Sequence, residues 1–315
     1  MNTSSILKTY GSLIIFGTIL AVSSCGGSGG GGSSGAGTGT MSLQITDGPV
    51  DTADNVFIQF HGLELQSADG KRTTLYYCQD PIDSTKTIVS ADACTTPPKS
   101  KQLDLLTLNG GLADTLLDSF TLPSGHYSWM RLMVDTADPL DSYIVVLSTP
   151  YELIIPSGAE TGMKVNRGFD VPAGGSADFT IDFDLRKSVH LANGNYMLRP
   201  TLRMVDNVMV GSISGTVDAS LVPGGCTPAV YVFEGSGVTP DDIDGIAPDP
   251  VATASVKLDN MSVYRYQAAF LEAGSYTIAF TCDAAADDPT VDNALTFSGT
   301  TTVSVVAKTN TVHNF

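Results

Sequence analysis

The acidic run Asp241-Asp242-Ile243-Asp244-Gly245 is the pattern in this sequence that comes closest to a ligand set for a metal ion. Calcium prefers several hard oxygen ligands in a flexible loop, and carboxylates supply them. The order of an EF-hand fails, because placing Asp242 and Asp244 at its third and fifth positions puts Pro240 first and Val251 twelfth. Asp242 and Asp244 remain weak candidates for calcium, and we expect a solvated acidic loop with no metal or cofactor.

The histidines are the next residues that could do chemistry. They are far apart in the chain and share no motif: His61, His126, His190 and His313. No serine lies in a G-x-S-x-G elbow, and neither H-E-x-x-H nor a P-loop occurs. A catalytic triad could still assemble in space, since sequence order does not define one. The expectation is a protein that is not an enzyme, with satisfied or exposed histidines.

Aromatic residues offer one alternative, a platform that stacks against a sugar ring. Tyr76 and Tyr77 are adjacent, so in a strand they point to opposite faces and one of them should be buried. Trp129 lies between Ser128 and Met130, and we expect it to face the core with Tyr127. A carbohydrate site is therefore kept as the alternative.

The N-terminus has the three parts of a signal peptide. A polar segment with Lys8 precedes an apolar run from Gly11 to Val22, which is shorter than the roughly 20 residues of a spanning helix. Val22-Ser23-Ser24-Cys25 resembles the lipobox of bacterial lipoproteins. The resemblance implies cleavage after residue 24, thioether lipidation of Cys25 and acylation of its new amine, for example with palmitate. Gly26 replaces the Asp that would favour inner-membrane retention, which favours the outer membrane, on either its periplasmic or its surface face.

Four cysteines remain once Cys25 carries lipid, and three pairings are possible. The signal peptide directs the chain to an oxidising compartment, where disulfides persist. Pairing Cys78 with Cys94 and Cys226 with Cys282 keeps each bridge inside one predicted domain, and this is our prediction. Zinc binding by these cysteines is the alternative interpretation, but no C-x-x-C spacing or adjacent histidine favours it.

Composition restricts the partners. The formal net charge of −17 repels phosphate backbones, so nucleic acid is not an expected partner. The hydrophobic fraction of 42% is too high for a disordered chain. Residues 25–40 read as a lipidated cysteine and a flexible Gly/Ser-rich tether. The length that follows predicts two domains, residues 41–206 and 207–315.

Period-two hydrophobicity beyond the tether predicts an all-β protein. The clearest strand is Ala177–Leu185, whose apolar residues share one face while Asp178, Thr180, Asp182 and Asp184 form what we expect to be a solvated stripe. Helical periodicity is confined to Leu105–Leu117, which could hold one short helix. Many short strands separated by turns indicate two tandem antiparallel β-sandwiches, Ig-like or transthyretin-like.

One turn pattern occurs in both halves. Leu122-Pro123-Ser124-Gly125-His126-Tyr127 and Leu271-Glu272-Ala273-Gly274-Ser275-Tyr276 each place an aromatic residue two positions after a glycine. A tyrosine at such a corner of a sandwich can donate its hydroxyl to nearby backbone. We expect the pattern to be architectural.

The first half resembles the bacterial lipoprotein family known as domain of unknown function 4382, from about Met41 to Asp206. The residues that carry the resemblance lie in three stretches: Ser42–Val50, Asn55–Phe60 and Leu122–Val134. The second half is similar to small transthyretin-like or carboxypeptidase-regulatory-like sandwiches in Ile213–Val217 and Ala273–Thr277. The first resemblance implies an envelope lipoprotein of unassigned activity, and neither supplies a catalytic residue.

The sequence therefore predicts a lipid-anchored cell-envelope protein. Its expected role is noncatalytic, binding or scaffolding a protein or glycan partner whose identity the sequence does not give. The alternative is a carbohydrate-binding or hydrolytic protein with a site assembled from loops. A deep pocket lined by convergent polar residues would favour ligand capture, and a closed core with shallow surfaces would favour scaffolding.

Overall fold

The computed structural model describes residues 37–48, 53–78, 88–95, 97–156 and 158–315. Within these residues the predicted all-β fold class is confirmed, with strands paired into four sheets. The helices are single turns: α1 (Gly158–Thr161), α2 (Leu185–Ser188), η1 (Ala91–Ala93), η2 (Leu105–Leu108), η3 (Ala219–Leu221) and η4 (Ala284–Ala286).

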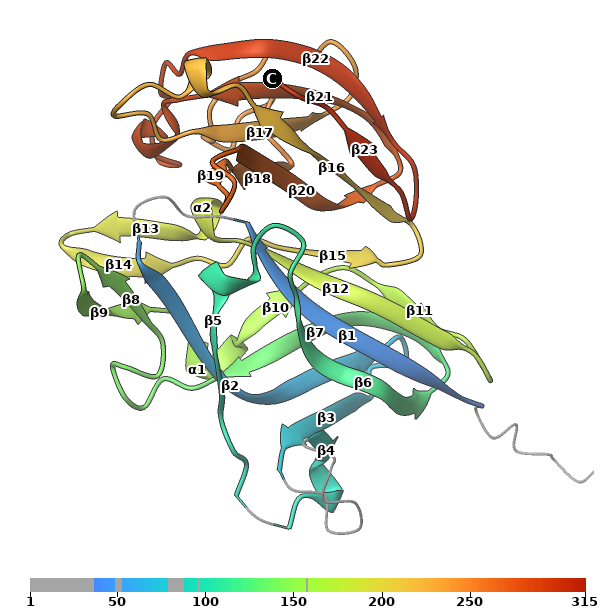
Figure 1. Cartoon of the computed structure of the whole chain (residues 1–315). Coiled ribbons are helices and arrows are strands. Elements are labelled where there is room, and N and C mark those ends of the chain that lie inside the picture. Colours follow the sequence, from blue (N-terminus) through green and yellow to red (C-terminus); the bar gives the residue numbers. More distant parts are fainter. Residues whose placement is uncertain (1–36, 49–52, 79–87, 96, 157) are drawn as a thin grey trace, which may run out of the picture. The chain divides into compact units, whose positions relative to one another are not determined.

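The first sheet has the order β15 (Leu202–Asp206), β12 (Ser176–Asp184), β1 (Thr38–Gly48), β6 (Asp114–Pro123). β1 lies between β12 and β6 (Figure 1). β1 and β12 are parallel, with Thr46 opposite Asp182 and Gly48 opposite Asp184, whereas the other two pairs are antiparallel. Because β1 begins at Thr38, the last three residues of the predicted tether belong to this strand.

The second sheet is larger, and β2 (Asn55–Ser67) pairs with several of its strands. Its main path has the order β10 (Met163–Val165), β7 (Gly125–Val134), β2, β8 (Tyr143–Val146), β9 (Thr149–Ile154), β14 (Asn195–Leu198), β13 (Val189–Ala192). Four short strands pair beside this path: β11 (Phe169–Val171) on β7, β3 (Arg72–Tyr77) and β5 (Lys101–Asp104) on β2, and β4 (Ile88–Ser90) on β3. β9 and β14 are parallel.

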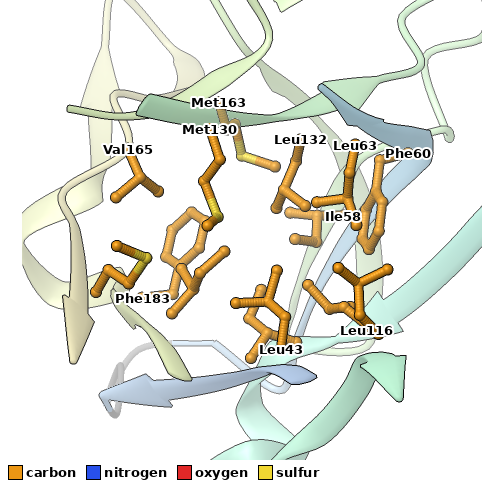
Figure 2. Close-up of a cluster of buried hydrophobic side chains, with 14 of the residues drawn as sticks. Leu43, Ile58, Phe60, Leu63, Leu116, Met130, Leu132, Met163, Val165 and Phe183 are labelled. Carbon is orange, nitrogen blue, oxygen red and sulfur yellow. The ribbon is translucent and has the colours of Figure 1, made fainter. Parts of the chain in front are cut away.

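One hydrophobic core fills the space between the first and second sheets. Alternate residues of each strand point to the same face, so the odd-numbered apolar residues of β1 and β12 all reach this core. Figure 2 shows Leu43 and Phe183 from the first sheet facing Ile58 and Leu132 from the second. Val56, Ile58 and Phe60 alternate with partly exposed residues, as their period predicts.

The C-terminal residues form the third and fourth sheets. The third has the order β19 (Lys257–Leu258), β20 (Tyr264–Glu272), β16 (Val210–Val217), β23 (Asn310–Val312). The fourth has the order β18 (Ala252–Ser255), β17 (Ala229–Glu234), β21 (Gly274–Thr281), β22 (Phe297–Val305). β16 and β23 are the parallel pair here. Ile213 and Tyr266 from the third sheet share a second core with Val230 and Ile278 from the fourth.

Both predicted tyrosine corners are present. The hydroxyl of Tyr127 donates to the carbonyl of Pro123 at 2.8 Å, and that of Tyr276 donates to the carbonyl of Glu272 at 2.8 Å. Gly125 precedes the first corner with φ of +139°, a conformation that favours glycine. Each bond fixes the start of a strand against the residue four positions earlier.

The short helix expected within Leu105–Leu117 differs from the structure. Leu105–Leu117 does not form one helix, because the 3₁₀ turn η2 ends at Leu108 and Gly110 and Gly111 then adopt φ of +67° and +87°. The chain continues into β6 from Asp114.

Polar contacts from α2 join the two sets of sheets. Arg186, which is buried, donates to the hydroxyl of Tyr231 at 2.6 Å, and that hydroxyl donates to a carboxylate oxygen of Asp287. Lys187 forms an ion pair with Asp249. From residue 36 onward the chain is one compact unit.

Candidate functional site

A cavity of about 470 Å³ lies where the first sheet meets the third and fourth sheets. Its volume is within the range of small-molecule sites. The lining mixes hydroxyl, amide, carboxyl and cationic groups with small apolar residues. The residues that carry these polar groups are Thr46, Asp47, Asn109, Asp182, Asp184, Ser214, Thr216, Thr253, Ser255, Lys257, Arg265, Tyr266, Gln267 and Asn314.

Asp47 is the most isolated charged group in this lining. It continues the row of β1 residues that face the core, after Leu43 and Ile45, and its side chain is only 6% exposed. Neither carboxylate oxygen makes a hydrogen bond. A buried polar group without a partner costs about 1–3 kcal/mol, more when charged, so this position carries a free-energy penalty.

The surroundings of Asp47 disfavour its charge. Burial raises the pKa of its carboxyl well above the ordinary value of 3.8, and the nearby carboxyl groups of Asp182 and Asp184 raise it further. The backbone amide of Leu185 opposes this rise in pKa, although it makes no hydrogen bond with either oxygen. Like charges in a water-poor site disfavour ionisation of one another.

Asp182 and Asp184 lie on the face of the parallel β1–β12 pair that points away from the hydrophobic core, whereas Asp47 follows the core-facing row of β1. Asp184 caps α2 by accepting from the amide of Lys187 at 3.1 Å. Burial raises the pKa of Asp184 to about 6, against the lowering effect of the Lys187 charge. Asp182 accepts from Arg203 through Nε at 3.2 Å and Nη2 at 2.5 Å.

The expected solvated stripe on β12 is therefore wrong. Thr180 is fully buried and bonded to Asn207, while Asp182 and Asp184 are only partly exposed and line the cavity. Asp178 alone is exposed. The alternation in the sequence predicts two faces correctly, but it does not show that residues beyond 206 cover the polar one.

Other polar groups complete the lining. Thr253 on β18 is buried and its hydroxyl makes no hydrogen bond. Lys257 donates to the side-chain oxygen of Asn109 at 3.2 Å. Arg265 is held by Asp259 at 2.6 Å. The cavity thus contains two buried side chains with unsatisfied hydrogen-bonding groups, while its cations already have partners.

The first half of the chain matches one known protein family. A family model described as Domain of unknown function (DUF4382) matches residues 38–200, just over half of the chain. The chain belongs to this family. Asp47 lies within the first of the stretches by which the sequence resembles the family. No curated protein matches the chain.

Solved structures resemble the chain only distantly. The TIE protein of Bacillus anthracis has 11% identity and a TM-score of 0.19, over 88% of this chain and 34% of that one. A leucine-rich repeat protein of Bacteroides thetaiotaomicron has 13% identity and a TM-score of 0.21, over 88% and 26%. The minor pilin GBS52 of Streptococcus agalactiae has 11% identity and a TM-score of 0.19, over 87% and 94%.

The chain spans about a third and a quarter of the lengths of the first two of these structures. TM-scores this low carry no argument about a common function, so the function has to be argued from the residues themselves. In the part of the chain that the structure describes, no helix has the length and apolar character needed to cross a membrane.

The weak calcium candidates have other partners. Asp242 is buried, and one of its oxygens accepts from the backbone amide of Asn293. Asp244 accepts from the amide of Ile246 at 2.7 Å, within its own loop. Among the described residues, no three His, Cys, Asp or Glu side chains are grouped so as to hold a metal ion. Both carboxylates act as acceptors that organise loops.

The cysteines separate into described and undescribed positions. The structure contains two disulfide bonds, Cys78–Cys94 and Cys226–Cys282, with Cα–Cα distances of 6.0 and 4.7 Å. Cys25 and the predicted signal peptide lie outside the described residues, so both the signal peptide and the lipid anchor stay predictions.

The four histidines do not come together. His61 contacts Asp135 at 2.6 Å on the second sheet, and His126 contacts Asp170 at 3.0 Å at the start of β7. Neither histidine lines the cavity. His61 and His126 therefore form two separate His–Asp pairs.

Trp129 does not face the core, contrary to the expectation from the sequence. Tyr127 faces the core, but Ser128 is an extra residue opposite the Gln66–Ser67 step of β2, and this bulge turns Trp129 to the outer face. Three cations surround the indole: Lys164 at 4.7 Å, Arg72 at 5.5 Å and Arg131 at 6.0 Å from the ring centroid.

The adjacent tyrosines behave as their alternation predicts. Tyr77 is buried in the core and Tyr76 is partly exposed beside His61.

Proposed function

We propose that this protein is a lipid-anchored binding protein of the bacterial cell envelope, and that the 470 Å³ cavity is its ligand site. The observation that carries the proposal is the pair of buried, unpartnered side chains in one cavity, Asp47 and Thr253. Buried polar groups in proteins are nearly always hydrogen-bonded, so groups left without partners in a cavity indicate a position that a ligand completes.

Binding is favoured over turnover by the chemistry of the lining. Its described residues include no histidine or cysteine, and Lys257 and Arg265 are held by neighbours. Most of its polar groups are hydroxyls, amides and carboxyls, which can hold a ligand through hydrogen bonds. A cavity of this volume with a largely polar lining favours ligand capture over a pure scaffold.

Hydrolysis is the second candidate, and one observation favours it. Asp47 and Asp184 both have raised pKa values in the same cavity, and a carboxyl group that keeps its proton near neutral pH can act as a general acid. Paired carboxyl groups are the usual catalysts of glycoside cleavage. Loss of glycosidase activity in Asp184→Asn, with ligand binding retained, would favour this candidate.

The location is proposed from the N-terminus. The lipobox-like Val22-Ser23-Ser24-Cys25 predicts a lipid on Cys25, and the Gly/Ser-rich residues after it give the folded part reach from the outer membrane. Cys25→Ala is expected to release the protein from membranes or block its maturation. Mass spectrometry that finds an unmodified mature N-terminus at another residue would refute the anchor.

We further propose a division into two domains, residues 41–206 and 207–315. The hydrophobic cores of these segments share no residue. The second would be a small sandwich of transthyretin-like or carboxypeptidase-regulatory-like type, on the residues that carry that resemblance. The cavity would then lie where the two domains meet, a common place for ligand sites.

The test of the binding site is to fill the cavity. Gln267 is exposed and lines it, so Gln267→Trp should occupy the space without disturbing the core. Thr300→Trp, on exposed β22 and outside the lining, is the matched control. After incubation with the small molecules of a bacterial envelope extract, native mass spectrometry should detect a bound, chemically unchanged ligand on wild type and control only. Equal capture by Gln267→Trp, or conversion of the ligand, would refute the proposal.

A further inference from the structure

We infer that the ligand of this cavity carries a cationic amine, and that Asp47 is the group that binds it. The inference rests on the proposed ligand site and adds the chemical class of the ligand. Asp47 lines the cavity, is 94% buried, and has two carboxylate oxygens without a hydrogen bond. A buried carboxylate is stabilised only by a partner that brings opposite charge or several hydrogen-bond donors.

The protein itself does not supply that charge. Arg203 is bound to Asp182, and Lys187 to Asp249. Of the cations in the lining, Arg265 is bound to Asp259, and Lys257 donates to Asn109. Arg203, Lys187 and Arg265 are therefore committed to other carboxylates, and Lys257 is exposed and directed to the side chain of Asn109.

The neighbours of Asp47 add negative potential. Asp182 and Asp184 both act on its carboxyl electrostatically, and Asp184 itself titrates at about 6 because of burial. Such a site attracts a positive group, and the low-dielectric walls strengthen the attraction. A bound amine would supply the favourable charge that the unpartnered carboxylate lacks.

An ammonium group fits this lining better than a metal ion does. Calcium takes six to eight oxygen ligands, and the described residues offer no group of three acidic, histidine or cysteine side chains around a common point. An ammonium group donates three hydrogen bonds. Asp47 can accept one, and the unpartnered hydroxyl of Thr253 is a further acceptor in the same cavity.

The test uses three probes with the same four-carbon chain and different charge: putrescine, γ-aminobutyrate and succinate. At physiological ionic strength, calorimetry and thermal denaturation should show that putrescine binds and stabilises the wild-type protein and that succinate does not. Asp47→Asn should weaken putrescine binding about tenfold or more, the loss expected when one charged partner of a hydrogen bond is removed. The unliganded variant should unfold no earlier than wild type, because it loses an unpartnered buried carboxyl.

Asp118→Asn is the control for nonspecific attraction to an acidic protein. It removes the same formal charge from an exposed position on β6, outside the cavity, and should leave putrescine binding unchanged. Equal binding by wild type and Asp47→Asn, or no binding of putrescine, would overturn the inference. So would a stabilisation by calcium chloride that depends on Asp47.

The two proposals fail separately. If succinate or a ligand from envelope extract binds, is blocked by Gln267→Trp and is indifferent to Asp47→Asn, the cavity is a ligand site but the amine is wrong. If Gln267→Trp blocks nothing, the ligand site itself is wrong.

Discussion

Replacing Asp184 with Asn should stabilise the protein above neutral pH and leave it unchanged in acid. Burial raises the pKa of Asp184 to about 6, from an ordinary value of 3.8. Between these values the folded state holds a proton that the unfolded chain has released. Stability contributed by this group is therefore present below about pH 4 and is lost as the pH rises through 6.

The size of the effect follows from the difference in pKa. At 1.36 kcal/mol per pKa unit it amounts to about 3 kcal/mol. Asp184 is partly exposed, so screening by water reduces this to about 1–2 kcal/mol. Asn is as good an N-cap as Asp, so the bond from the Lys187 amide can be kept. The first thermal unfolding transition should rise by about 2–6 °C at pH 8.

The assay is thermal denaturation of wild type and Asp184→Asn at pH 8 and pH 4. The midpoints should differ most at pH 8 and much less at pH 4, where the folded carboxyl is protonated and the unfolded carboxyl, with its ordinary pKa of 3.8, is close to half protonated. Asp182→Asn is the matched control on the same strand. It breaks the contact with Arg203 and should lower stability by about 1 kcal/mol at pH 8. A gain of equal size at both pH values, or a loss at pH 8, would refute the reasoning.

Four further substitutions test the architecture. Tyr127→Phe and Tyr276→Phe each remove one corner hydrogen bond. Each should lower the free energy of unfolding measured in urea by about 1 kcal/mol, and the two losses should add in the double variant. If neither variant loses stability, the corner hydrogen bonds do not stabilise the fold. Arg186→Met should cost about 3 kcal/mol, because it leaves the buried hydroxyl of Tyr231 and the partly buried carboxylate of Asp287 without their cation; equal stability would contradict that role. Cys226→Ser should cost about 4 kcal/mol in the chain-entropy model for a sequence separation of 56, and non-reducing peptide mapping should recover a Cys226–Cys282 peptide from wild type.

Local patterns in the sequence determined the strands and their apolar faces. The alternation in β12 predicted which residues reach the core, because in a strand the side-chain direction follows from position alone. The glycine and tyrosine of Leu122–Tyr127 predicted the first corner for the same reason, since the bond spans only four residues. The confirmed all-β fold class rests on such local signals.

Only the tertiary structure decided what the polar faces meet. The period-two pattern predicted that Trp129 faces the core, but a bulge at Ser128 turns its side chain to the other face of the sheet. Residues beyond 206 cover the polar face of β12, which turned an expected solvated stripe into part of a cavity. Asp47 stood in the sequence as an ordinary turn residue before Gly48, and its isolation arises from strands far away in the chain. Burial and electrostatic potential depend on every neighbour in space, so no local period or spacing encodes them.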